Sequence, residues 1–349
     1  MFATISSSTA PFTDTGLVYV SDSQPGIKRR RKGRGFCYTL PDGSLLKDPT
    51  QRARIAALGL PPAYENVWIC LEENGHLQAT GLDARGRKQY RYHKDWQALR
   101  SGDKFGQLIA FGKALPRIRR CVARHAEGVP GEMTTVLAAL TMLLDDAHLR
   151  VGNRSYTEQN NTYGATTLLK RHLRIVDGSA ELRFMAKGGK RVRRILRRPR
   201  LQRLLEAIAD LPGHQLFVWR DNDGAVRPID SGRLNGYLAE IARIPVSAKT
   251  FRTWAGSVAA YAAAASALNE GRRPTIKEMA EAAAAVLHNT PAICRSSYIH
   301  PHILELAGET MPVGAKARGF SVKLPKGLLA DENRMLQHLI RRLRRRPCP

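Results

Sequence analysis

The amino-acid sequence predicts an α+β protein, with a small β-rich N-terminal domain and a mainly α-helical domain that carries a β-hairpin. Three observations predict this fold class. Short apolar and aromatic runs between turn residues fill the first hundred positions, apolar residues then recur at helical spacing, and one strand-turn-strand pattern interrupts the helical part. The length of 349 residues, 43% of them hydrophobic, is enough for more than one core.

Composition and patterning divide the chain into four segments. Residues 1–15 are rich in Ser and Thr without hydrophobic period, which indicates a flexible leader. The β-rich domain is expected over 16–96, the mainly helical domain over 97–310, and a basic C-terminal tail over 311–349.

The charge balance points to a polyanionic partner. Lys and Arg number 56 against 30 Asp and Glu, a net charge of +26, and such a field attracts nucleic acid. A membrane is not expected to be the partner, because no stretch approaches the roughly 20 apolar residues of a spanning helix. The five cysteines form no Cys-x-x-Cys pair, which favours a reducing, cytoplasmic and nucleoid-associated location and argues against a zinc ribbon.

The N-terminal domain shows strand signals in sequence order. They are Leu17–Val20, Phe36–Tyr38, and two runs, 66–71 and 76–82, that flank the hairpin turn Asn74-Gly75. Between the first two runs, residues 27–35 hold six cations and are expected to connect strands along DNA phosphates.

The domain closes with a run that suits DNA contact. Arg87, Gln89, Tyr90 and Tyr92 alternate amide, aromatic and cationic groups, and Gln fits the adenine edge while Tyr and Arg fit bases and phosphates. An edge strand with one aromatic face explains the same pattern equally well.

The helical domain begins near Asp95. Residues 133–147 carry a single apolar stripe typical of a core helix, and Arg150 follows where that helix gives way to a loop. A hairpin is predicted from 165–176 through Asp177-Gly178 to 180–184, with Lys187 before two glycines at a mobile tip. Ten cations and no acid lie between 183 and 203, as expected of a polyanion track.

The last helices have clear start signals. Lys249 and Arg252 open an alanine-rich helix that runs to about 268, and Thr275 with Glu278 forms a capping box for a helix ending near 287. Thr290-Pro291 starts a short helix that ends by Tyr298. A tail helix from about 328 to 345 is expected to add nonspecific DNA affinity.

Four ordered motifs resemble the type IB DNA topoisomerases, in their compact poxvirus and bacterial form. They are Gly-Arg-Lys-Gln-Tyr-x-Tyr at 86–92, Arg-x-Gly-x-x-x-Tyr at 150–156, Lys-x-x-Arg-Thr at 249–253 and Thr-Pro-Ala-Ile-x-x-x-Ser-Tyr at 290–298. The resemblance spans roughly residues 17 to 305 and implies a clamp on double-stranded DNA; we also expect a monomer.

The resemblance implies roles for individual residues. Tyr298 is the expected nucleophile, Arg150 and Arg252 the clamp on the phosphoryl oxygens, and Lys187 the general acid. Lys249 and Tyr156 would hold the DNA backbone, and Arg87, Gln89, Tyr90 and Tyr92 would contact the groove. No metal, ATP or other cofactor is implied, and the chain has no phosphate-binding Gly-x-x-x-x-Gly-Lys-Ser/Thr loop.

Asn289 departs from the poxvirus pattern, which has histidine nine residues before the tyrosine. Asn offers a neutral N–H donor to a phosphoryl oxygen, and His288 is the neighbouring alternative. Two rival functions remain at this stage. A tyrosine recombinase shares the chemistry but typically has His where this chain has Lys249, and a non-catalytic DNA-binding protein leaves the Arg, Lys, Arg and Tyr set unexplained.

Overall fold

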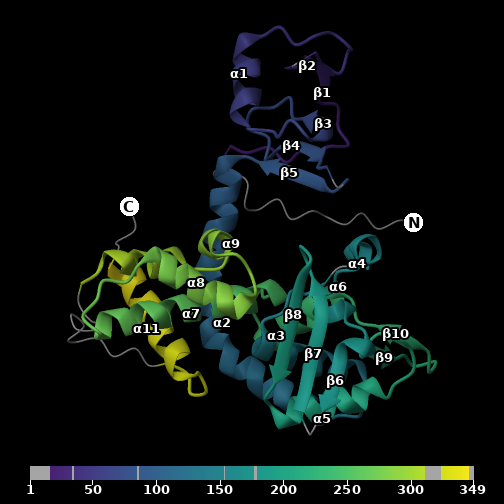
Figure 1. The fold of residues 1–349 in the computed structure, drawn as a ribbon, viewed down its shortest axis with the longest axis vertical. Helices are drawn as coiled ribbons and strands as arrows, with labels where there is room; N and C mark the ends of the chain where they lie inside the picture. Colours follow the sequence, from purple (N-terminus) through teal and green to yellow (C-terminus); the bar gives the residue numbers. More distant parts are fainter. Residues whose placement is uncertain are drawn as a thin grey trace. The chain divides into compact units, whose positions relative to one another are not determined.

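The computed structural model describes residues 16–33, 35–84, 86–152, 154–176, 179–310 and 324–345. The chain forms two compact units, Met1–Asp103 and Lys104–Pro349. The expected leader at 1–15 lies outside the described residues, as do the Asp177-Gly178 turn and parts of the tail, 311–323 and 346–349. The predicted α+β fold class is confirmed, with an antiparallel sheet in the first unit and a mainly helical second unit (Figure 1).

The first unit is built on a five-stranded antiparallel sheet in the order β2-β1-β3-β4-β5. The strands are β1 (Ile27–Lys32), β2 (Gly35–Thr39), β3 (Glu65–Ile69), β4 (Leu77–Leu82) and β5 (Lys88–Tyr92). One helix, α1 (Pro49–Ala57), which the sequence patterns did not predict, begins at Asp48, whose side chain accepts from the Thr50 amide at 2.8 Å. Ile55 of α1 packs with Ile27, Val67 and Ile69 of the sheet.

Two predictions for this unit were wrong. Leu17–Val20 is not a strand, because only Val18 bridges to Gly75. The basic run is not a connection but strand β1, which pairs with β2 and β3 on its two edges. Its Arg29 donates to Pro61 O at 2.9 Å and Tyr64 O at 2.7 Å and stacks on Phe36. This cation therefore holds the loop at Pro61–Tyr64 in place.

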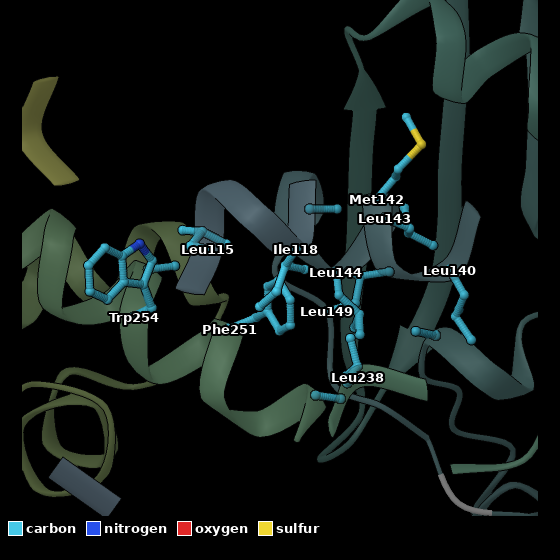
Figure 2. Packing of buried hydrophobic residues seen from close by; sticks show 14 of the residues in the cluster. Leu115, Ile118, Leu140, Met142, Leu143, Leu144, Leu149, Leu238, Phe251 and Trp254 are labelled. Carbon is cyan, nitrogen blue, oxygen red and sulfur yellow. The ribbon is translucent and has the colours of Figure 1, made fainter. Parts of the chain in front are cut away.

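The second unit has a helical core around α3 (Met133–Ala147), whose bounds are those predicted from its apolar stripe. Figure 2 shows Ile118 of α2 (Lys94–His125) and Phe251 of α7 (Ala248–Asn269) beside Leu144 of α3, with Leu115 and Trp254 further along the same two helices. Leu140, Leu143 and Leu144 are fully buried. The remaining helices are α4 (Arg154–Asn160), α5 (Pro199–Ala209), α6 (Ser231–Ala242), α8 (Ile276–Leu287), α9 (Pro291–Ser297), α10 (Pro301–Leu304) and α11 (Ala330–Arg345).

A three-stranded sheet, in the order β6-β7-β8, lies within this unit (Figure 1). Its strands are β6 (Leu173–Val176), β7 (Ser179–Ala186) and β8 (Lys190–Leu196), and a separate pair joins β9 (Val218–Arg220) to β10 (Val226–Pro228). The predicted hairpin therefore starts later than expected. Residues 165–167 and 170–172 form 3-10 turns, held by bonds such as Ala165 N to Arg150 O at 2.7 Å.

The tail helix α11 is a packed part of the second unit. Met335, Leu336 and Leu339 are fully buried. The Glu332 carboxylate receives Arg119 at 2.8 Å and the Trp254 indole N–H at 3.1 Å. Its burial shows that α11 does more than carry surface charge. Of the helices among the described residues, none has the length and apolarity needed to cross a bilayer.

Candidate active site

Tyr298 stands at the end of the short helix α9. Thr290 caps the helix by accepting from the Ile293 amide at 3.4 Å, and Pro291 occupies the first turn, as the start signal predicted. The amide of Tyr298 donates to Cys294 O at 2.9 Å, and Cys294 is fully buried. The tyrosine side chain is only 8% exposed, so α9 turns it inward.

Helix α7 holds the backbone of Tyr298 from behind. Ser257 Oγ donates to Tyr298 O at 3.3 Å and accepts from the His300 amide at 3.0 Å. Gly256 lies so close that a Cβ there would sit 2.7 Å from Tyr298 O. The absence of a side chain at Gly256 therefore allows the close approach of α7 to the tyrosine.

Arg252, on the same helix, is the side chain that faces Tyr298. Its guanidinium carbon lies 5.1 Å from the centroid of the tyrosine ring. It donates to Leu287 O at 3.0 Å and to His148 O. These carbonyls end helices α8 and α3, where the helix dipoles favour a cation.

Burial and the charge of a second cation both affect the pKa of Arg252. Burial lowers the pKa of the Arg252 guanidinium, Tyr298 opposes that change, and the Arg150 charge adds to it. An arginine nevertheless stays protonated in a protein. Arg150 follows α3 and is half-buried, and its positive charge lies near that of Arg252 and near the Cys294 thiol of α9.

Strand β8 brings a further cation, Lys190, near Cys294 of α9. Lys187 is exposed in the turn between these strands, where Gly188 and Gly189 have φ values of 82° and 70°. Burial raises the pKa of the Cys294 thiol, and three nearby cations oppose that rise. They are Arg252, Arg150 and Lys190, and the last of these is three residues beyond Lys187.

Asn289 and His288 both border the site. His288 ends α8 in the left-handed conformation, with φ 47°. Burial lowers its pKa, and neighbouring cations lower it further. Asn289 Oδ1 accepts from the Thr290 amide at 3.1 Å.

Three buried nitrogens of the site have no hydrogen-bond partner among the described residues. They are Asn289 Nδ2, His288 Nε2 and Arg252 Nε. Buried donors in folded proteins are normally bonded. The Asn289 amide and the Arg252 guanidinium are donors, and they suit the oxygens of an anion.

Arg194 is a neighbour that the sequence patterns did not single out. It lies on β8 between the buried Val192 and Leu196 and donates to Val286 O. Val192, Arg194 and Leu196 are alternate residues of the strand and so share one face. This period of two in the sequence was the signal that Arg194 points inward. Lys249 is exposed in the first turn of α7, one turn before Arg252, and the side chain of Tyr156 lies outside the described part of the chain.

Of the expected DNA contacts of the first unit, Gln89, Tyr90 and Tyr92 lie on its edge strand β5, and Arg87 lies in the turn just before it. Tyr90 and Tyr92 stack with centroids 6.0 Å apart and are 49% and 38% exposed. Arg87 and Gln89 both donate to Asp83. The strand is therefore an edge strand with an aromatic face, as the second interpretation required, and that face is open to a ligand.

Comparison with known proteins covers both units. Residues 92–302 match the eukaryotic DNA topoisomerase I catalytic core, and residues 35–83 match the bacterial DNA topoisomerase IB N-terminal domain. DNA topoisomerase 1B of Acanthamoeba polyphaga mimivirus is 30% identical over 292 residues, covering 80% of this chain and 87% of the viral protein. DNA topoisomerase 1B of vaccinia virus strain Copenhagen is 24% identical over 124 residues, 36% of this chain and 39% of the viral protein.

These matches, with the fold and the arginine-tyrosine site, define an enzyme that changes DNA topology. More particularly, the chain belongs to the type IB DNA topoisomerase family. The resemblance seen in the four sequence motifs is thereby confirmed.

Proposed function

We propose that the protein relaxes supercoiled DNA by breaking and rejoining one strand through a covalent bond to Tyr298. The phenol oxygen attacks the phosphorus in line, a Tyr298 Oη–P bond forms, and the bond from phosphorus to the 5′ oxygen breaks. The contact between Arg252 and the Tyr298 ring carries this proposal. A fixed cation at that position favours the phenolate and the negative charge that grows on the phosphoryl oxygens.

The neighbouring side chains bind the phosphoryl oxygens and protonate the leaving group. Arg150 and Arg252 hold the non-bridging oxygens with their planar donors. Asn289 Nδ2, a buried donor without a partner among the described residues, gives a further hydrogen bond to the same group. Lys187 protonates the departing 5′ oxygen from the hairpin tip.

Religation reverses these steps. The 5′ hydroxyl attacks the phosphotyrosyl bond, which has kept the energy of the original phosphodiester, so ATP is not required. Fixed guanidinium and ammonium groups supply the charge that a divalent ion supplies in other phosphoryl-transfer enzymes. Between cleavage and religation, torsion in the DNA drives strand rotation.

DNA binding draws on both units. Arg87, Gln89, Tyr90 and Tyr92 contact the groove, and Lys249 and Tyr156 hold the backbone near the cleaved phosphate. The net charge of +26 supports association with DNA and the nucleoid. That the protein closes as a clamp around duplex DNA follows from its family, and we propose that it does so as a monomer. Such binding weakens as salt rises, because counterions are released from DNA.

Relaxation of supercoiled plasmid in EDTA, without ATP, tests the proposal. We expect activity from the wild type, none from Tyr298→Phe, and DNA binding by both. Tyr261→Phe, which alters another buried tyrosine of the second unit, is the matched control and should relax DNA. Denatured reactions should contain protein linked to the 3′ end of a nicked strand. Relaxation by Tyr298→Phe, or no such adduct from the wild type, would contradict the proposal.

A further inference from the structure

Two arginines from different elements hold neighbouring carbonyls at the end of α8. The last four carbonyls of a helix have no partner within the helix, and a cation near them also meets the negative end of the helix dipole. Here Arg252 of α7 donates to Leu287 O at 3.0 Å, and Arg194 of β8 donates to Val286 O. The proposed function uses Arg252 at the phosphate and gives Arg194 no role.

The side chain of Arg194 is fixed at its own end by the sheet. It shares one face of β8 with Val192 and Leu196, which are both buried. Burial lowers the pKa of the Arg194 guanidinium and the nearby charge of Asp146 opposes that change, while an arginine stays protonated in a protein. A charged donor therefore ties β8 to the end of α8, and such hydrogen bonds are stronger than those between neutral groups.

The chain that leaves this helix end leads directly to Asn289. The backbone amide of Asn289 donates to Ala284 O at 3.2 Å, and its side-chain Oδ1 accepts from the Thr290 amide at 3.1 Å. The side-chain nitrogen, Nδ2, is buried and has no hydrogen-bond partner among the described residues. The direction of that N–H therefore depends on where the last turn of α8 is held.

We propose that Arg194 is a positioning residue for DNA cleavage, which holds the last turn of α8 so that Asn289 Nδ2 meets the phosphoryl oxygen. The inference rests on the proposed function and adds a residue from outside the phosphate-binding set. Arg194 acts through the Val286 carbonyl and does not itself contact the phosphate. Since β8 follows the hairpin tip that carries Lys187, the same hydrogen bond links the strand beside the general acid to the helix end before Asn289.

The test compares single-turnover cleavage rates on prebound DNA. Arg194→Met keeps an apolar stem of similar length but removes the donors, and it should slow cleavage by about 10- to 100-fold because Asn289 is displaced. The affinity for DNA should be unchanged, because the guanidinium is bonded to the protein. Arg194→Lys, whose ammonium can still donate to Val286 O, should recover most of the rate.

A second background separates positioning from a general loss of stability. In Asn289→Ala, which lacks the positioned donor, adding Arg194→Met should slow cleavage no further. A substitution that acted only by weakening the fold would slow both backgrounds equally. Arg233→Met is the control, since Arg233 pairs with Asp230 at the start of α6, at 3.5 Å, and this variant should cleave at the wild-type rate.

Hydrogen exchange in the DNA-free protein gives a readout that needs no cleavage. Arg194→Met should speed amide exchange in peptides that contain residues 284–290, because the end of α8 is released. The inference is overturned if exchange there is unchanged, if Arg194→Met cleaves at the wild-type rate, or if it slows the Asn289→Ala background as much as the wild type. A wild type that forms no covalent adduct would contradict the proposed function, whereas unchanged exchange would contradict only this inference.

Discussion

The guanidinium carbon of Arg252 lies 5.1 Å from the centroid of the Tyr298 ring, and the two residues are 4% and 8% exposed. Arg252 is held there by the last carbonyls of two helices, so its direction does not depend on DNA. The Tyr298 ring therefore contacts a cation whose orienting hydrogen bonds are present before DNA binds. Each of the following predictions concerns a contact that supports this pair or the unit around it.

Arg252→Lys should slow single-turnover cleavage by about 10²- to 10³-fold. A lysine supplies one compact ammonium, which cannot bond both helix-end carbonyls and a phosphoryl oxygen as the planar guanidinium does. The measurement is the rate of covalent adduct formation on prebound DNA. Arg295→Lys, at an exposed position on α9, is the control and should match the wild type. Equal rates for the two variants would contradict the role given to Arg252.

Lys187→Ala should slow the cleavage of ordinary DNA. The cleavage rate of this variant should recover on a substrate with a 5′-bridging phosphorothiolate. A thiolate leaves without a proton, because thiols have a pKa near 8.5, so the general acid is no longer needed. Single-turnover rates on the two substrates give the comparison. Lys190→Ala, in the same hairpin, should show no such recovery. Without recovery for Lys187→Ala, Lys187 is not the acid.

Gly256→Ala should destabilise the second unit by about 1–3 kcal/mol and impair cleavage. The new Cβ would lie 2.7 Å from Tyr298 O and 3.0 Å from Leu287 Cδ1, so α7 and α9 must separate. Thermal unfolding and the cleavage rate measure the two effects. The control is Gly236→Ala in α6, where the Cβ meets nothing within 4 Å and should be neutral or stabilising. Equal melting temperatures for the two variants would show that α7 does not need a glycine at position 256 to pack against Tyr298.

Glu332→Gln should lower the free energy of unfolding by about 3 kcal/mol, because it leaves the half-buried Arg119 without one of its two carboxylates. Burial raises the pKa of Glu332, but its bonds to Arg119 outweigh burial and hold the pKa below the usual 4.5. The carboxylate therefore stabilises the fold above that value and ceases to do so as pH falls through the lower folded pKa. Urea unfolding at pH 7 gives the difference.

The adjacent Asp331→Asn is the control for Glu332→Gln. Asp331 pairs only at the surface, with Arg334 at 3.4 Å, and its loss should change stability by less than about 0.5 kcal/mol. If both variants unfold at the same urea concentration, α11 is not held by Glu332.

His148→Asn should reduce the loss of stability in mild acid. Burial lowers the pKa of His148 from 6.5 to about 4. Between these values the unfolded chain binds the proton more readily, so stability falls as pH drops from 6.5 to 4 and is unaffected above. Asparagine tolerates the left-handed backbone at this position, φ 52°, and does not titrate. Melting temperatures at pH 7.5 and pH 5 should differ less for the variant than for the wild type.

The sequence by itself determined the local features of this protein and the identities of its expected site residues. The bounds of α3 followed from one apolar stripe, and the starts of α8 and α9 followed from Thr275 and Thr290-Pro291. Such signals act within one or two turns of chain. The motifs at 86–92, 150–156, 249–253 and 290–298 indicated the family because they are contiguous runs of residues.

Only the tertiary structure decided which distant groups support those residues. Strand β1 has five consecutive cations and no alternation, and it forms because β2 and β3 pair with its edges. Gly256 matters because Tyr298 packs against it, and Glu332 because Arg119 and Trp254 reach it across the core. Apart from the short β1–β2 hairpin, these contacts join residues tens to hundreds of positions apart, and no local propensity encodes them. They arise when burial of the core brings the helices together.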